Sequence, residues 1–339
     1  MLLNAGTADN VILQIKHGPS DFQVRKPNSP LIGAMKNTAQ AIELQVTQEY
    51  TGQQIDLYAL AVQWEEIFAS PVSDTRTMCD LMGREVTAIV AVANTGLDEN
   101  WTGHTLAQAN LYSFGRMACD PSLTAREILS DWIALTFGAG IGGGSGSDFC
   151  PGSESHGKLL EMMLASRGVY EKYTTPLGLC WMVNINHHYG PSPEGYEFMK
   201  WGTYHRANHK AIGVDRTEKG TGYTAQYHPY LNDLYSNVET CPEELLLYFH
   251  RLPYDFPLKD GRTLLQYTYD THFEGYDEVE GFIRTWDSLR SLLPECAYES
   301  VAARLQRQLA NAREWRDVVN TYFYRLTGVG DEHGRLIYD

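Results

Sequence analysis

Two carboxylates, Asp21 and Glu49, each follow a stretch of extended-strand character, and together they could perform acid–base chemistry on a sugar. The apolar runs Val11–Lys16 and Ile42–Gln48 precede them. Two parallel strands joined by a crossover would bring both acids to one rim of a sheet, where α/β folds gather catalytic groups. Carboxylates across a sugar-sized gap are what glycoside hydrolysis requires. From spacing alone, two solvated acids in loops remain an equal alternative.

The elements that must position these acids alternate between strand and helix over residues 1–96. The nearly continuous apolar run Thr87–Val92 is typical of a parallel strand that is buried on both faces. Leu57–Phe68 and Thr77–Met82 offer helical material for the preceding crossover. Right-handed βαβ connections would align the three strands in one parallel sheet.

From Trp101 onward the sequence pattern is helical. Leu106–Met117 predicts a helix, and Thr124–Glu127 predicts a capping box at the start of the next one. A last long helix carries one apolar stripe in steps of three and four, formed by Val301, Leu305, Leu309, Ala312, Trp315, Val319 and Tyr322. The expected fold class is therefore α/β followed by a mainly α-helical part.

Composition excludes some partners. The net charge of −15 argues against nucleic acid or an anionic membrane surface. No apolar run approaches the roughly 18 residues of a membrane span. The six cysteines lie far apart without a C-x-x-C pair, which argues against a structural zinc site and leaves disulfides and the compartment open.

Two further patterns invite cofactor or metal interpretations. Gly138, Gly140 and Gly143 form a G-x-G-x-x-G, but the dinucleotide fingerprint needs a strand before it, and Ile128–Phe137 is helical in pattern. A flexible loop is therefore favoured over an oxidoreductase site. The four histidines His187, His188, His205 and His209 lack acidic or cysteine partners at ligand spacing. Neither a metal nor a cofactor is therefore expected.

Nine segments, in order along nearly the whole chain, carry a family resemblance. They are Asn10–Arg25, Glu43–Gln54, Asn100–Gly103, Ala107–Arg116, Pro176–Leu179, His187–Pro191, Ile212–Thr217, Leu246–Pro253 and Arg284–Leu289. These segments resemble the family 67 α-glucuronidases. The resemblance implies that residues 1–100 are the C-terminal part of a (β/α)8 catalytic barrel and that residues 101–339 are an α-helical C-terminal domain.

The resemblance also implies an inverting glycosidase that removes α-1,2-linked (4-O-methyl)glucuronic acid from xylo-oligosaccharides. Asp21 and Glu49 match its two base-side carboxylates, and which of them is the base stays open. The family's general acid is a glutamate on an earlier strand, for which this sequence offers no counterpart. We therefore expect the chain to be a fragment of a longer enzyme.

The remaining expectations concern binding. The lysine of the family that matches Lys16 binds the carboxylate of glucuronic acid, while Trp201 is a candidate aromatic wall of the pocket and Arg25 is expected to pair with a structural acid. The family needs no metal, and it forms homodimers through its helical domain. Because the sequence offers no general acid, a non-catalytic carbohydrate-binding or dimerisation module derived from the enzyme is the alternative hypothesis.

Overall fold

The computed structural model describes residues 10–35, 37–97, 100–138, 148–179, 182–195 and 205–337. Two compact units make up the fold, each assembled from separate parts of the chain. The first unit comprises Met1–His17, Leu31–Val169 and Glu278–Leu309, and the second comprises Gly18–Pro30, Tyr170–Asp277 and Ala310–Asp339.

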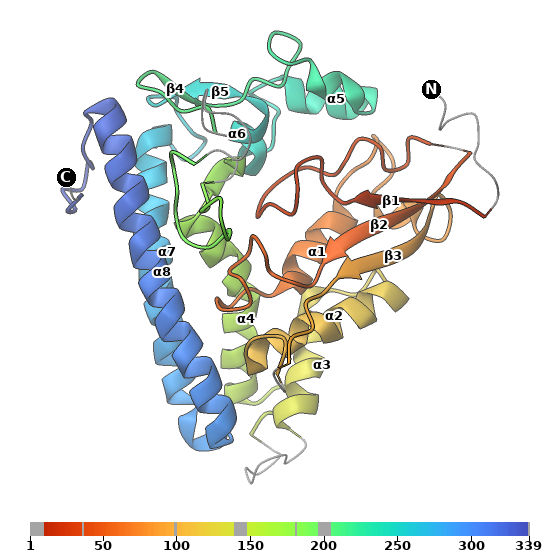
Figure 1. Ribbon diagram of the computed structural model, residues 1–339, viewed down its shortest axis with the longest axis vertical. Coiled ribbons are helices and arrows are strands. Elements are labelled where there is room, and N and C mark those ends of the chain that lie inside the picture. The colour runs from red at the N-terminus through yellow and green to blue at the C-terminus, as the bar shows by residue number, and fades with distance from the viewer. Residues whose placement is uncertain are drawn as a thin grey trace. The chain divides into compact units, whose positions relative to one another are not determined.

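The first unit contains a three-stranded parallel sheet. Its strands are β1 (Ile12–Lys16), β2 (Ala39–Gln45) and β3 (Val86–Val92), with β2 in the middle, and Figure 1 shows them side by side in red to orange. The register pairs Ile15 with Ile42, and Ile42 is fully buried. All three predicted strands are therefore present. Only the middle strand, β2, is largely buried, as is typical of a central parallel strand; β3 is mostly half-buried, so the prediction that it is buried on both faces is wrong.

The crossover between β2 and β3 contains α1 (Leu60–Ala69) and a short 3-10 turn, η2 (Cys79–Leu81). Helix α1 begins three residues later than the apolar pattern predicted. Side chains from elsewhere in this unit accept hydrogen bonds from its first backbone amides: Ser166 Oγ from Ala59 at 2.9 Å and Asn110 Oδ1 from Leu60 at 2.9 Å. These bonds satisfy N–H groups that lack partners inside the helix, and so they define where the helix starts.

The rest of the first unit is helical. The capping box is confirmed, because the Thr124 side chain accepts from the Glu127 amide and the Glu127 side chain accepts from the Thr124 amide. Trp64 of α1 and Phe114 of the following helix pack edge to face, with 6.1 Å between their ring centroids. The elements are η3 (Thr105–Ala107), α2 (Gln108–Cys119), α3 (Ala125–Phe137) and α4 (Glu154–Tyr173), of which the last four residues, Tyr170–Tyr173, belong to the second unit.

The second unit combines short helical turns with one small antiparallel pair of strands. Its apolar centre includes Tyr235, which stacks on Phe249 with 4.4 Å between ring centroids. Each of its two strands has three residues, as expected for a mainly helical part. The elements are η4 (Pro176–Gly178), β4 (Ala211–Gly213), η5 (Tyr223–Gln226), α5 (Pro229–Ser236), η6 (Glu243–Leu245), α6 (Leu246–Phe249) and β5 (Arg251–Pro253).

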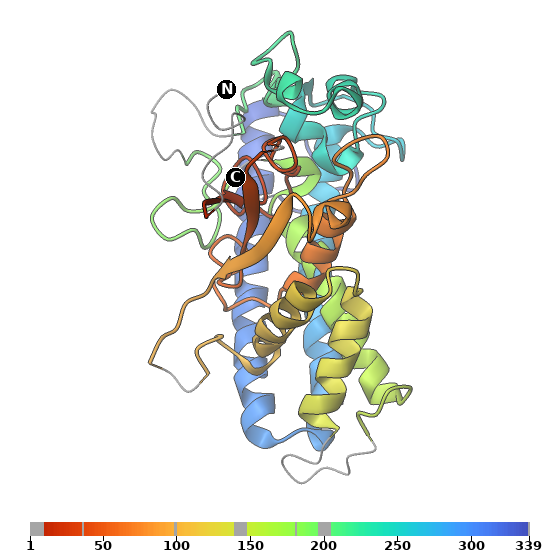
Figure 2. The ribbon, with the colours of Figure 1, turned by 90° about the vertical axis from the view of Figure 1, so that its right-hand side faces the viewer.

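Two long helices, α7 (Leu264–Ser288) and α8 (Glu295–Thr327), are joined through η7 (Arg290–Leu292). Figure 1 and Figure 2 both show them side by side. The predicted stripe on α8 is confirmed for its five most buried members, Val301, Leu305, Ala312, Trp315 and Val319, while Phe323 rather than Tyr322 lies in the core. Among the helices that the structure describes, none is long and apolar enough to cross a membrane.

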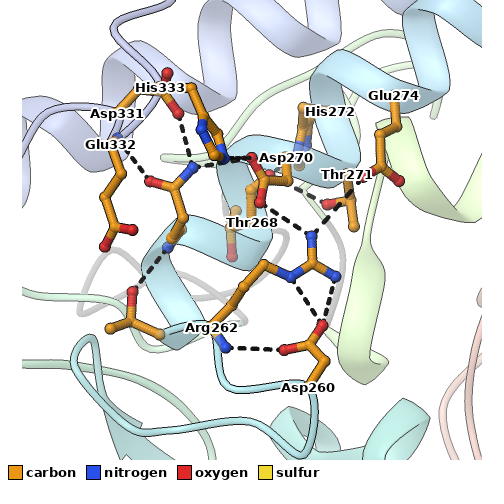
Figure 3. A network of polar contacts seen from close by, with 12 residues as sticks. Asp260, Arg262, Thr268, Asp270, Thr271, His272, Glu274, Asp331, Glu332 and His333 are labelled. Carbon is orange, nitrogen blue, oxygen red and sulfur yellow. Dashed lines mark hydrogen bonds and ion pairs between the residues drawn. The ribbon is translucent and has the colours of Figure 1, made fainter.

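A polar network fastens the segment after α8 to α7 within the second unit (Figure 3). At its centre is the buried carboxylate of Asp270, which accepts hydrogen bonds from Arg262 at 3.0 Å and from Arg335. Gln266 donates to both Asp270 and Asp331. Burial opposes the charge of Asp331, but the hydrogen bonds from Arg335 and Gln266 outweigh it and place the pKa of this carboxyl well below its ordinary value.

Candidate functional site

Lys16 is the last residue of β1, and its side chain is exposed. The parallel register places it beside Glu43 of β2. The Glu43 carboxylate accepts a hydrogen bond of 2.6 Å from Gln14, two residues before Lys16 on the same face of β1. A lysine, a glutamine and a glutamate therefore share one polar face at the C-terminal ends of β1 and β2.

Glu49 lies four residues beyond the end of β2 and is partly buried. Its carboxylate accepts a hydrogen bond of 3.1 Å from Gln45, the last residue of β2. Its backbone carbonyl accepts another, of 2.9 Å, from the Gln53 side chain. The glutamate is thus held from the strand on one side and from the following turn on the other.

The turn after Glu49 is built from left-handed backbone conformations. Gly52, Gln53 and Gln54 have φ angles of 98°, 54° and 56°. For a residue with a Cβ such φ values are uncommon. They persist where packing and hydrogen bonds from neighbouring residues hold the backbone in place. Here a Cβ at Gly103 would collide with the carbonyl of Gln54, and the Gln54 side chain donates to the Trp101 carbonyl at 3.2 Å. Tight packing of the 101–103 backbone fixes the turn.

Asp21 lies in the segment Gly18–Pro30, which belongs to the second unit. It is partly buried, and the three residues after it, Phe22, Gln23 and Val24, are each at most 6% exposed. The Asp21 carbonyl accepts a hydrogen bond of 2.6 Å from the Gln23 amide and another from the Lys26 ammonium group. A well-packed loop therefore carries this acid.

Three contacts attach this loop to the rest of the second unit. Arg25 and Glu171 of α4 form two parallel hydrogen bonds, Nε–Oε1 at 2.9 Å and Nη2–Oε2 at 2.7 Å, which confirms that Arg25 pairs with a structural acid. The Ser20 hydroxyl lies 3.1 Å from that of Tyr248. Tyr227 donates to the Asn28 carbonyl at 2.9 Å.

The structure thus places two of the predicted site residues in one unit and one in the other. Lys16 and Glu49 belong to the first unit, and Asp21 belongs to the second. A common cavity for Asp21 and Glu49 stays a prediction. Trp201 lies outside the described residues.

The second unit contains a cavity of about 720 Å³ between the loop at Pro191–Glu194 and the C-terminal half of α8. Its lining includes Tyr322 and Arg325, but none of Lys16, Asp21 and Glu49. A large cavity is the usual first candidate for a ligand site. The sequence motifs that contain these three residues, and that specify the chemistry, lie outside this cavity lining.

Of the four histidines considered as metal ligands, His205 has a structural role. His205 is 1% exposed; its Nε2 bonds to the Pro193 carbonyl, and its Nδ1 accepts from the Ala207 amide at 3.2 Å. Both ring nitrogens are therefore occupied, and burial lowers the pKa of this histidine to about 4. Over the described ranges, no three His, Cys, Asp or Glu side chains form a group that could hold a metal.

The glycine-rich stretch follows a helix, because α3 ends at Phe137. The dinucleotide fingerprint requires a strand at this point, and its second and third glycines, Gly140 and Gly143, lie outside the described residues. No pattern in the sequence singles out Lys26, Gln48 or Glu171. Gln48 is buried and donates to the Thr51 carbonyl at 2.8 Å; its only sequence signal is its place next to Glu49.

Comparison with known proteins agrees with the motifs. Residues 2–101 match the model of the glycosyl hydrolase family 67 middle domain, and residues 102–336 match that of the glycosyl hydrolase family 67 C-terminus. The chain is 39% identical over 338 residues to a protein of Aspergillus clavatus named "Probable alpha-glucuronidase A". It is 38% identical to alpha-glucuronidase A of Aspergillus tubingensis over 338 residues and of Emericella nidulans over 342 residues. These alignments cover 97% of this chain but only 38–39% of each relative.

Proposed function

This chain belongs to glycosyl hydrolase family 67, and on that premise we propose that it supplies the base side of an inverting α-glucuronidase. The substrate would be a xylo-oligosaccharide that carries α-1,2-linked (4-O-methyl)glucuronic acid. One of Asp21 and Glu49 would accept a proton from the attacking water, and the other would hold that water in place. An inverting site needs room for water between its carboxylates and the sugar.

Lys16 would bind the carboxylate of the glucuronic acid. A charge-assisted hydrogen bond to an ammonium group selects an acidic sugar over a neutral one. Lys16 is exposed at the end of β1. Trp201 would add an aromatic wall to the same pocket.

The proposal includes an architecture. Residues 1–100 would form the last part of a (β/α)8 barrel, with β1, β2 and β3 as three of its strands, and residues 101–339 would form the helical C-terminal domain. In such barrels the catalytic groups lie at the C-terminal ends of the strands. A homodimer through the helical domain is part of the same proposal.

One observation carries the proposal above the others. Within the match to the middle-domain model, residues 2–101, Lys16 is the last residue of β1, Asp21 follows that strand by five residues, and Glu49 follows the next strand, β2, by four. Parallel strands bring such groups to one edge of a sheet. We propose no general acid among the residues of this chain.

The test compares two proteins on aldouronic acids. One is this chain alone, and the other joins it behind the N-terminal part of the Aspergillus tubingensis alpha-glucuronidase A. We expect the chain alone to be at least 100-fold slower, because general acid help is typically worth 10²–10⁴-fold. In the fusion, Asp21→Asn and Glu49→Gln should each lower kcat at least 100-fold, and ¹H NMR should show the inverted anomer as first product.

An active fusion that tolerates both substitutions would remove these acids from the mechanism. The alternative, a non-catalytic sugar-binding module, is favoured if the fusion is inactive while the chain alone binds aldouronic acids in titration calorimetry. The C-terminal cavity then becomes the place to search, with Tyr322→Ala as the first variant.

A further inference from the structure

The loop that carries Asp21 is closed on itself by one lysine. The Lys26 ammonium group donates to the carbonyl of Ser20 at 2.9 Å and also to the carbonyl of Asp21. Its alkyl chain passes directly over Gly18, where any Cβ would collide with the Lys26 side-chain carbons. The ammonium nitrogen also lies 5.1 Å from the centre of the Phe22 ring. Lys26 thus contacts the backbone on both sides of Asp21.

A second group of contacts holds the same loop from outside. The Arg25 and Glu171 side chains are 18% and 12% exposed, so their ion pair is largely shielded from water. A bidentate guanidinium–carboxylate pair fixes direction as well as distance. Because Arg25 is adjacent to Lys26, the ion pair with Glu171 of α4 and the hydrogen bonds of Lys26 restrain the same short stretch of backbone.

We propose that Lys26, supported by the Arg25–Glu171 pair, positions the Asp21 carboxylate for catalysis. This inference rests on the proposed function. Lys26 is a positioning residue rather than a catalytic one, because its ammonium group is engaged by backbone carbonyls. Loops are the least precise place for a catalytic group, and a misplacement of about 1 Å can cost 100-fold in rate. Two donor bonds to residues 20 and 21 restrict that movement.

The inference predicts a specific kinetic pattern. Lys16, not Lys26, is the residue proposed to bind the uronic acid, so removal of the Lys26 ammonium group should leave KM nearly unchanged. Lys26→Met keeps the alkyl chain over Gly18 and removes only the donor. We expect kcat of the fusion to fall 10- to 100-fold, and Lys26→Arg, which restores a donor, to recover part of it.

A second readout uses the chain alone and does not depend on activity. The Gln23 amide donates to the Asp21 carbonyl at 2.6 Å, so its hydrogen exchange reports on the loop backbone. We expect Lys26→Met to accelerate exchange of this amide at least tenfold. The matched control is Lys172→Met, which removes a lysine of α4 paired with Glu274 at 3.4 Å outside the loop. It should change neither kcat nor Gln23 exchange.

The outcomes separate the two proposals. If Asp21→Asn leaves kcat unchanged, the proposed role of Asp21 is wrong. If Asp21→Asn abolishes turnover while Lys26→Met preserves either kcat or slow Gln23 exchange, the positioning role is overturned. Should Lys26→Met fail to fold, Glu171→Gln provides the same comparison through the outer anchor. In that variant, unchanged kcat and unchanged Gln23 exchange would overturn the inference.

Discussion

Arg25 and Glu171 lie 146 positions apart in the chain, and their side chains form a two-point ion pair in the second unit. This pair joins the segment after β1 to helix α4. Without it, the guanidinium group and the carboxylate would each lose a charged partner at a site with little water. The contact therefore carries energetic weight that most ion pairs on a protein surface lack.

Arg25→Met should lower the free energy of unfolding by about 1–3 kcal/mol, because it removes the two charge-assisted hydrogen bonds that the largely buried Glu171 carboxylate accepts from Arg25. The double exchange Arg25→Glu with Glu171→Arg should recover part of the loss. Urea unfolding followed by circular dichroism measures both. Arg126→Met is the control, since its pair with Glu161 is 57% and 63% exposed; a larger loss for Arg126 than for Arg25 would contradict the ranking.

Lys16→Met should weaken binding of the acidic sugar more than it slows the chemical step. Loss of a charge-assisted hydrogen bond costs about 1.5–3 kcal/mol, so KM of the fusion for aldouronic acids should rise roughly tenfold or more. Gln14→Met, two residues earlier on the same face, serves as the control. Equal effects of the two substitutions on KM would argue against a specific contact with the uronic acid.

Three buried histidines should make the fold sensitive to mild acid. Burial lowers the pKa of His104, His205 and His272 from 6.5 to about 4. The unfolded chain then binds more protons than the folded one between pH 6.5 and 4, so stability falls as the pH falls through this window. Each histidine contributes a slope of at most about 1.4 kcal/mol per pH unit.

The measurement is urea unfolding at pH 7, 6 and 5. The variant His272→Gln should show a shallower decline than the unsubstituted chain, whatever its stability at pH 7. Ring signals of the three histidines in NMR spectra should remain those of the neutral form down to about pH 5. Rings that become protonated at pH 6 or above would disprove the assignment.

Arg335→Met should loosen the segment after α8, because it removes the ion pairs that Arg335 forms with Asp270 and Asp331. The carboxylate of Asp270 is only 6% exposed and keeps its ion pair with Arg262, so the expected cost is that of the lost charge-assisted hydrogen bonds, about 1.5–3 kcal/mol. Faster hydrogen exchange over residues 328–337 is the direct readout. Arg284→Met, whose ion pair with Glu280 is 3.8 Å and exposed, should leave that segment unchanged.

Sequence periodicity located the three strands but not the points where their hydrogen bonding stops. The second strand was predicted over Ile42–Gln48 and is observed over Ala39–Gln45. The amides of Val46 and Thr47 both donate to the carbonyl of Val92, which ends the regular ladder. Such a shared acceptor depends on the partner strand and leaves no trace in local composition.

Motifs located Lys16, Asp21 and Glu49, yet they could not predict which part of the fold holds each one. The boundary between the first and the second unit falls between His17 and Gly18, inside the motif Asn10–Arg25, which is continuous in sequence. The loop that carries Asp21 is held by Lys26, which is near in sequence, and by the pair that Arg25 forms with Glu171, which is not. Pairing over 146 positions requires the three-dimensional structure or a comparison of many related sequences.

The Lys26 side chain fills the space that a Cβ at position 18 would need, and this limits how the two positions can evolve. A mutation that gives position 18 a side chain removes the space through which the lysine reaches the Ser20 and Asp21 carbonyls. Each substitution alone would be selected against, whereas a joint change would be tolerated only where another residue holds the loop. Across related sequences, a lineage that has replaced Gly18 should therefore also have replaced Lys26, whereas Gly18 can persist where the lysine has been lost.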